Sequence, residues 1–180
     1  MISPTNPLER KDLAALVRRV SQVSGEFRLR SGETSNTYFD KYLFECDPLI
    51  LEAVCISMKE LIPEGTDVLA GLEMGGIPIV TILSNLAGIP SAFIRKERKS
   101  YGTCKYAEGS DLNQKNVTIV EDVVSSGGAI LDAVEKFRKD DVHCTHAICV
   151  IDREAGGADA LKEVGVELRS IFTMHELSKA

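Results

Sequence analysis

The chain has 180 residues, of which 44% are hydrophobic and 27% charged, and its formal net charge is −6. These values are typical of one globular domain, and no apolar run approaches the ~20 residues that span a bilayer. The acidic balance argues against a general nucleic-acid binder, which needs a broad basic face. We therefore expect one domain over residues 1–180, with no membrane and no nucleic-acid partner.

The cysteines and the amino end favour a cytoplasmic protein. Five cysteines are an odd number without a Cys-x-x-Cys pair, which argues against a disulfide framework and against a zinc site. The opening residues, Met-Ile-Ser-Pro-Thr-Asn, lack the charged and apolar regions of a signal peptide. We expect most of the cysteines to be small core residues or free thiols.

Two helices are expected in the first third of the chain. Asn6, Pro7 and Glu9 resemble a helix start, and apolar residues then recur on one face as far as Val20. A second helix is signalled by Asp47-Pro48 and closed by Pro63 and Gly65. Residues 1–45 are expected to form an N-terminal helix and a hood subdomain.

The hood segment, residues 27–40, mixes turn residues with aromatics. Tyr38 and Phe39 are suited to stacking on a planar base, and packing into the core fits their composition equally well.

Short apolar runs alternate with helical segments from residue 68 onward. Strands are expected at 68–70, 92–94, 117–120, 147–151 and 166–172, and helices at 77–87, 129–139 and 157–164. This order predicts an α/β fold with a central, mostly parallel sheet and helices on both faces. Ligands of such sheets bind outside the carboxyl ends of the strands, so the loops beginning at Gly71, Arg95, Glu121 and Asp152 should face one crevice.

The stretch 117–131 contains a strand, an acidic pair, a turn of small residues and a helix start. The small residues at 125–128 let consecutive backbone N–H groups converge on an anion at the positive end of the helix. Glu121 and Asp122 are expected to leave the strand just before the turn and to accept hydrogen bonds from vicinal hydroxyls. The stretch predicts a site for a ribose and its phosphate, although ordinary strand-to-helix loops have a similar composition.

The other three loops carry weaker signals. Gly75 and Gly76 offer bare amides for a second phosphate contact, although such turns are common and no P-loop pattern is present. Residues 95–105 hold five of the 21 basic residues, which favours a polyanion ligand over a solvated charge run. The planar fork of Arg153 suits a carboxylate of the substrate, and an ion pair with a neighbouring acid is the alternative.

With these loops in view, the chain resembles the orotate phosphoribosyltransferases, a family of type I phosphoribosyltransferases. The resemblance runs from about Phe27 to Met174. It rests on four motifs in the family's order, which are Ser31-Gly32-x-x-Ser35 with Tyr38-Phe39-Asp40, Arg95-Lys96-x-x-Lys99, the stretch from Glu121 to Ala129, and Asp152-Arg153. The resemblance implies transfer of a phosphoribosyl group from 5-phosphoribosyl 1-diphosphate (PRPP) to orotate in pyrimidine biosynthesis, giving orotidine 5'-phosphate and pyrophosphate.

The resemblance also implies a role for each candidate residue. Glu121 and Asp122 would hold the ribose hydroxyls, and Arg95 and Lys99 would act with them in catalysis, at the pyrophosphate. Arg153 would bind the carboxylate of orotate. The whole expected substrate-binding set is Arg30, Tyr38, Phe39, Gly75, Gly76, Arg95, Lys96, Lys99, Tyr101, Glu121, Asp122, Val123, Val124, Ser125, Ser126, Gly127, Gly128, Ala129 and Arg153.

A cofactor and a partner follow from the same resemblance. Mg²⁺ is expected, held mainly by substrate and water and by no direct protein ligand. A homodimer is expected to share the loop 95–105 across its subunits. Two positions depart from the family: Arg30 stands where a lysine is frequent, and Tyr101 where a histidine, with a reference pKa of about 6.5, would be the better proton donor.

Two alternatives to orotate transfer remain open from the sequence. One is a phosphoribosyltransferase for another base, because the stretch 117–131 does not specify the base. The other is a PRPP-sensing regulator without the reaction. Such a regulator predicts a nucleic-acid surface, which the net charge of −6 disfavours, and it has no need of the basic loop.

Overall fold

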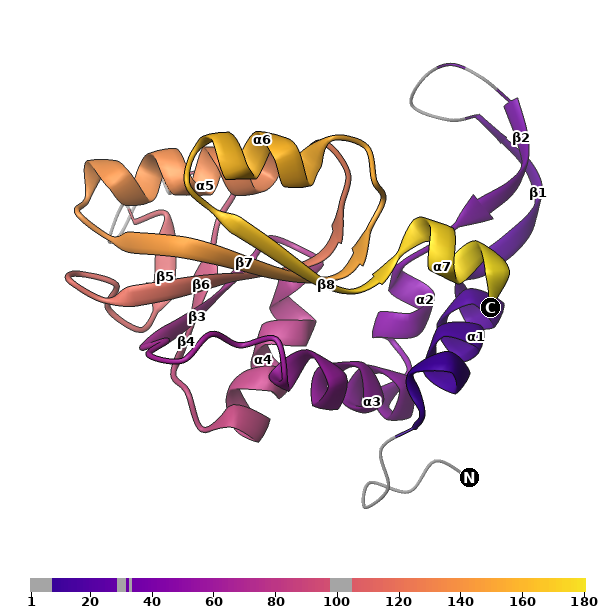
Figure 1. The fold of residues 1–180 in the computed structure, drawn as a ribbon, viewed down its shortest axis with the longest axis horizontal. Coiled ribbons are helices and arrows are strands. Elements are labelled where there is room, and N and C mark those ends of the chain that lie inside the picture. Colours follow the sequence, from indigo (N-terminus) through magenta and orange to yellow (C-terminus); the bar gives the residue numbers. More distant parts are fainter. Residues whose placement is uncertain (1–7, 29–31, 33, 98–104) are drawn as a thin grey trace.

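The computed structural model describes residues 8–28, 32, 34–97 and 105–180 (Figure 1). The expectations for Arg30, Lys99 and Tyr101, and for a helix start at Asn6-Pro7, therefore lie outside the described residues. Two sheets are present in the described part, one of six strands and one of two.

The larger sheet has the strand order β5-β4-β3-β6-β7-β8. Its strands are β3 (Val68–Leu72), β4 (Ser91–Ile94), β5 (Ala107–Gly109), β6 (Asn116–Val124), β7 (His143–Asp152) and β8 (Glu167–Thr173). All neighbouring strands are parallel except β5, which runs antiparallel to β4. From β3 the chain first adds β4 on one side and later β6 on the other, so the strand order reverses at β3. Such a switch point favours a ligand site between the carboxyl ends of β3 and β6.

Helices cover both faces of this sheet (Figure 1). One face carries α3 (Pro48–Lys59) and α4 (Gly76–Ala87), and the other carries α5 (Gly128–Lys139) and α6 (Gly157–Glu163). Alternate residues of β6 enter two separate cores: Val120 packs in the core on the α3 and α4 side, whereas Ile119 packs in the core on the α5 side. The predicted α/β class, with a mostly parallel sheet between helices, is confirmed.

The N-terminal part forms a two-stranded hairpin and two helices that pack on the end of the sheet. These elements are α1 (Arg10–Ser21), β1 (Gln22–Arg28), β2 (Thr34–Phe39) and α2 (Tyr42–Glu45), and the C-terminal helix α7 (Met174–Lys179) lies beside them (Figure 1). Leu13 and Val17 of α1 are fully buried in the first core. Arg10 binds Glu176 of α7 at 2.7 Å, so the two ends of the described chain are joined.

The predicted elements agree with the structure in position and differ in length. Asp47 caps α3 as expected, because its Oδ1 accepts hydrogen bonds from the amides of Leu49 and Ile50 at 2.9 and 3.2 Å. Strand β6 continues four residues beyond the predicted end at Val120. The short strand β5 and the helix α7 were not predicted, although Thr173 and Glu176 form a capping box that the sequence pattern Thr-x-x-Glu signals.

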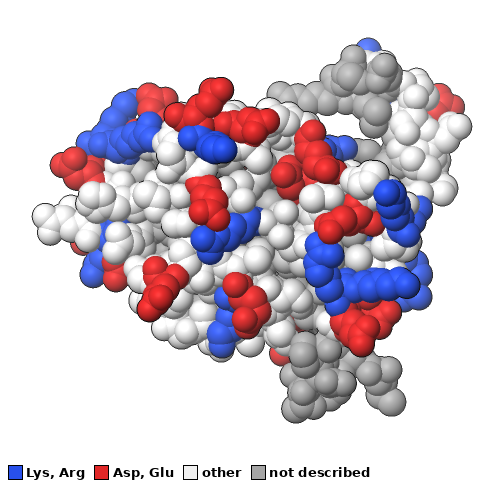
Figure 2. All heavy atoms as spheres, in the orientation of Figure 1, with Lys and Arg blue, Asp and Glu red and all other residues white. Residues whose placement is uncertain are grey.

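Four of the five cysteines lie in the described residues, and all four are free thiols. Cys55 and Cys149 are buried, Cys46 is exposed and Cys144 is intermediate, which agrees with the expectation of core residues and free thiols. Among the described helices, none has both the length and the apolar character needed to cross a bilayer. Acidic and basic side chains are interspersed on the face shown in Figure 2, rather than gathered into a broad basic surface.

Candidate functional site

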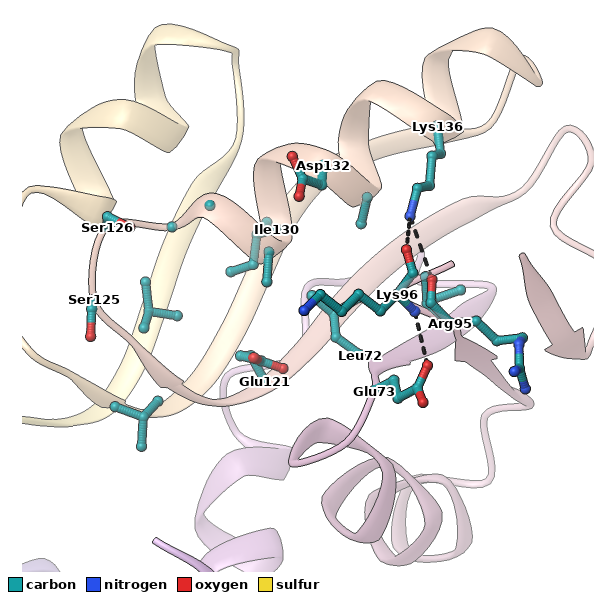
Figure 3. A pocket seen from close by; sticks show the side chains of 17 residues that line it. Leu72, Glu73, Arg95, Lys96, Glu121, Ser125, Ser126, Ile130, Asp132 and Lys136 are labelled. Carbon is teal, nitrogen blue, oxygen red and sulfur yellow. Dashed lines mark hydrogen bonds between the residues drawn. The ribbon is translucent and has the colours of Figure 1, made fainter. Parts of the chain in front are cut away.

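A cavity of about 490 Å³ opens at the carboxyl ends of β3, β4 and β6 (Figure 3). Ligand pockets of proteins commonly have volumes of roughly 300–1,000 Å³. Three of the four loops expected to face one crevice meet here, and the fourth, at Asp152, does not line the cavity. The lining residues are Leu72, Glu73, Ile94, Arg95, Lys96, Glu121, Val123, Val124, Ser125, Ser126, Gly127, Gly128, Ala129, Ile130, Asp132, Ala133 and Lys136.

One wall of the cavity is the turn of small residues between β6 and α5. Gly127 has a φ of 76°, a left-handed conformation that glycine adopts at no steric cost, and it is the N-cap of α5. The first amides of a helix have no acceptor within the helix. The N–H groups at the start of α5 and the positive end of its dipole therefore face the cavity, as an anion site requires.

The acidic pair lies inside β6 rather than beyond its end, which corrects the expectation that both carboxylates leave the strand before the turn. Neighbouring residues of a strand point to opposite faces, so the two side chains separate. Glu121 lines the cavity on the α5 side, and Asp122 is fully buried on the side of α4. The sequence did not predict this division between two faces: Glu121 lines the cavity, and Asp122 does not.

The glycine loop before α4 packs directly on the acidic pair. A Cβ atom at Gly75 would overlap the Asp122 carboxylate, and one at Gly76 would overlap the Val120 carbonyl and come within 3.2 Å of Glu121 Oε2. The two glycines do not line the cavity. The close approach to the carboxylates thus explains why side chains larger than glycine do not fit at these two positions. This steric reason is separate from the expected bare amides.

Lys41 binds Asp122 and was missed by the sequence analysis. Its Nζ lies 2.5 Å from Asp122 Oδ2. Burial alone would lower the pKa of Lys41, but the hydrogen bond and the charge of Asp122 outweigh burial and raise it. Lys41 directly follows the hood segment, where nothing in the sequence pattern connects it with a residue 81 positions later.

Two further carboxylates crowd this ion pair. Glu45 is 6% exposed, and burial, followed by the charge of Asp122, raises its pKa to about 8. Burial and the charge of Asp122 also raise the pKa of Glu121. Glu45 lies four residues after Lys41, a spacing that places both side chains on one side of a helical turn. That spacing was the only sequence signal for this cluster.

The start of the basic loop lies against the cavity (Figure 3). The Lys96 side chain extends across the cavity toward Glu121, whereas the Arg95 guanidinium points away from it. The Lys96 backbone is held on both sides: its N–H donates to Glu73 Oε2 at 2.9 Å, and its carbonyl accepts from Lys136 Nζ at 2.9 Å. Glu73 and Lys136 were not predicted, because each acts on the backbone of another residue.

The expected base-binding residues lie apart from the cavity. Tyr38 is 48% exposed and contacts Phe27 with ring centroids 5.5 Å apart, whereas Phe39 packs against the first core. Of the two interpretations of these aromatics, the structure therefore supports core packing for Phe39. Neither Tyr38 nor Phe39 lines the cavity.

Arg153 is exposed beside the small-residue turn, where its amide donates to the Val124 carbonyl at 2.8 Å. Its acidic neighbours have other partners, since Asp152 Oδ1 accepts from the Glu154 amide at 2.9 Å and Glu154 Oε2 accepts from the His175 amide at 3.0 Å. The alternative of an ion pair with either neighbour therefore gains no support.

Comparison with known proteins gives a consistent result. The family model described as phosphoribosyl transferase domain matches residues 51–172. The orotate phosphoribosyltransferase of a Nocardioides species is 46% identical over 168 residues, which are 93% of this chain and 94% of that protein. The orotate phosphoribosyltransferase of Methanocella arvoryzae is 38% identical, over 92% of this chain and 95% of that protein.

Solved structures of orotate phosphoribosyltransferases have a fold similar to that of this chain. The crystal structure of Mycobacterium tuberculosis orotate phosphoribosyltransferase in complex with Fe(III) dicitrate has a TM-score of 0.85 at 30% identity, over 93% of this chain and 98% of that one. A structure of the same enzyme in complex with PRPP has a TM-score of 0.80 at 27% identity, over 94% of this chain and 98% of that one.

Proposed function

Because the chain belongs to the orotate phosphoribosyltransferase family, we propose that it transfers the 5-phosphoribosyl group of PRPP to orotate, giving orotidine 5'-phosphate and pyrophosphate. The observation that links this function to particular residues of the chain is the cavity at the point where the strand order reverses. It combines an amide-rich helix start, a carboxylate and a lysine within one space. A phosphate, a ribose and a diphosphate need those three kinds of group.

PRPP would bind along the cavity with its 5'-phosphate on the amides from Ser125 to Ala129. Glu121 and Asp122 would accept hydrogen bonds from the ribose hydroxyls. The diphosphate would lie toward Lys96, whose side chain already extends across the cavity. The predicted contacts of Lys99 and Tyr101 lie outside the described residues and stay predictions.

The reaction is a displacement at the anomeric carbon of the ribose. Positive charge develops on the ribose as pyrophosphate departs, and a nearby carboxylate stabilises such a charge. Glu121 and Asp122 would serve this end of the reaction, while Lys96, Lys99 and Arg95 would neutralise the leaving group. Orotate is already anionic, so the site needs no strong base.

Mg²⁺ fits this donor set only as an ion held mostly by substrate and water. In the described part of the chain, no group of three His, Cys, Asp or Glu residues is arranged to hold a metal. Mg²⁺ commonly keeps several waters and binds substrate phosphates, so such a cage is not required. Bound in this way, the ion would neutralise charge on the diphosphate.

Orotate would be selected by its carboxylate. Arg153 is exposed and its backbone lies beside the small-residue turn, and the bidentate geometry of its guanidinium matches a carboxylate. Ser125 of that turn would contribute a hydroxyl. The exposed Tyr38 remains a candidate for stacking on the base from the hood.

A homodimer and a cytoplasmic location are further parts of the proposal. Tyr42, Leu43 and Leu49 are exposed apolar side chains close together in sequence, and such groups are common at subunit contacts. Free thiols at four cysteines suit a reducing compartment. Light scattering would test the dimer, and cell fractionation the location.

The residue assignment is tested by PRPP-dependent consumption of orotate in Asp122→Asn and Lys99→Ala. We expect both variants to lose most of the turnover. Asp12→Asn, at an exposed position of α1, is the control for loss of a carboxylate and should keep full activity. Unchanged turnover in both site variants would overturn the assignment.

A further inference from the structure

Asp122 is held from two sides by groups that do not line the cavity. On the side of α4, the Gly75 backbone comes so close that no Cβ atom fits between it and the carboxylate. On the side of α2, the Lys41 ammonium lies 2.5 Å from Oδ2. The Asp122 side chain is fully buried, whereas 31% of the Lys41 side chain is exposed. Lys41 therefore connects the hood subdomain with a carboxylate of the ribose site.

The ion pair is surrounded by acids. Glu45 lies beside it on α2, Glu121 precedes Asp122 on β6 with its side chain on the other face, and each interacts electrostatically with Asp122. Lys41 is the cation that interacts with all three carboxyls. The other titratable groups that face the cluster are Asp40 beside α2, Tyr42 with its ring centroid 5.3 Å from Lys41 Nζ, and Cys149 on β7.

The number of charges decides which acids stay protonated. Two buried carboxylates, Glu45 and Asp122, and the half-buried Glu121 cannot all be ionised at low cost beside one ammonium, because an unpaired buried charge is strongly unfavourable. The raised pKa of Glu45, about 8, means that this carboxyl favours its protonated form near neutrality, and burial and the charge of Asp122 raise the pKa of Glu121 as well. The charge that remains is the Lys41–Asp122 pair. Removing the ammonium would leave the buried Asp122 carboxylate without this counter-ion.

We propose that Lys41 is a positioning residue of the ribose site, acting through Asp122: its ammonium pairs with that carboxylate and holds it in the orientation that the ribose hydroxyls need. The proposal rests on the proposed function, since it assumes that Asp122 binds ribose. Glu45 also contributes to this arrangement, because its protonated carboxyl adds no further negative charge beside Asp122.

The test compares Lys41→Met with Lys41→Arg over a range of pH. In Lys41→Met, kcat/KM for PRPP should fall at least about tenfold at pH 7, because removing one partner of a buried ion pair leaves the other charge uncompensated. The acid limb of the pH profile should move to higher pH, and KM for orotate at saturating PRPP should stay unchanged. In Lys41→Arg, the acid limb of the profile should lie at the same pH as in the wild type. Lys139→Met removes an exposed lysine paired with Glu135 at 2.7 Å, and it should match the wild type.

Two results would overturn the proposal. One is a wild-type kcat/KM for PRPP with an unmoved acid limb in Lys41→Met. The other is an equal loss at every pH in both Lys41 variants, which would mean that the residue only packs. Glu45→Gln provides an independent test if Lys41→Met does not fold. Because Glu45 is already protonated on the acid side, the acid limb should stay in place, and the variant should differ from the wild type only as the pH rises through about 8. An acid limb that moves in Glu45→Gln contradicts the proposal.

Direct PRPP binding separates this inference from the proposed function. Titration calorimetry with PRPP alone, across the same pH range, should show weaker binding in Lys41→Met than in the wild type. If the wild type binds PRPP but does not consume orotate, the proposed function fails while the role of Lys41 is still measured. Equal PRPP affinity in the wild type and Lys41→Met at pH 7 would overturn the role of Lys41 alone.

Discussion

Lys136 of α5 donates a hydrogen bond from its Nζ to the Lys96 carbonyl at 2.9 Å (Figure 3). The same Nζ lies 3.4 Å from the Arg95 carbonyl. The helix that begins at the small-residue turn therefore also fixes the first residues of the basic loop. Glu73 holds the Lys96 amide from the opposite side, so both walls of the cavity determine where the Lys96 side chain lies.

Lys136→Met should weaken PRPP use without unfolding the protein. A hydrogen bond to a charged group contributes on the order of 1.5 kcal/mol, and partial exposure reduces this, so we expect kcat/KM for PRPP to fall about fivefold. Lys139→Met, nearly one turn further along α5, is the control and should show wild-type kinetics. Steady-state kinetics with varied PRPP checks this, and equal values for the two variants would contradict the role of Lys136.

Glu45→Gln should change how stability depends on pH. A carboxyl whose folded pKa is raised to about 8 contributes stability that is fully present below its unfolded pKa and is lost as the pH rises through about 8. The wild type should therefore lose stability relative to Glu45→Gln between pH 5 and pH 9. Thermal melts of both proteins across this range measure the difference. A constant difference in melting temperature would mean that Glu45 does not titrate in this way.

Gly75→Ala should destabilise the protein, whereas Gly128→Ala should not. The added methyl at Gly75 would overlap the Asp122 carboxylate, and overpacking of this kind costs about 1–3 kcal/mol. At Gly128 the nearest atom to a new Cβ is Ser126 Oγ at 3.8 Å, which is an ordinary contact. Replacing glycine by alanine at a compatible position stabilises by about 0.4–1 kcal/mol. Urea unfolding of both variants distinguishes the sites, and equal free energies of unfolding would contradict the close approach at Gly75.

The sequence predicted the sheet and the small-residue turn before α5 because both depend on local patterns. Apolar runs separated by helical segments predict parallel strands, and small residues before a helix predict an anion site wherever the rest of the chain lies. The extension of β6 through Glu121 and Asp122 was missed because polar residues do not look like a buried strand. Their polar side chains are accommodated there by the cavity on one face and by Lys41 on the other.

The groups missed by the sequence analysis are those that act over long separations. Lys41 pairs with Asp122, Lys136 binds the carbonyl of Lys96, and nothing in the local composition of either lysine predicts its partner. The strand β5 was also missed, since three residues, Ala-Glu-Gly, have no recognisable period and pair only because β4 offers a free edge. Such contacts are specified by the tertiary fold rather than by the pattern of residues along the chain.

The central claim is that this chain joins orotate to PRPP, and the most direct measurement is pyrophosphate release with orotate, uracil and adenine compared at equal PRPP. We predict rapid release with orotate and little with the other two bases, because Arg153 is expected to bind a carboxylate that uracil and adenine lack. Faster release with uracil or adenine than with orotate, or displacement of orotate by either base in competition, would contradict the claim.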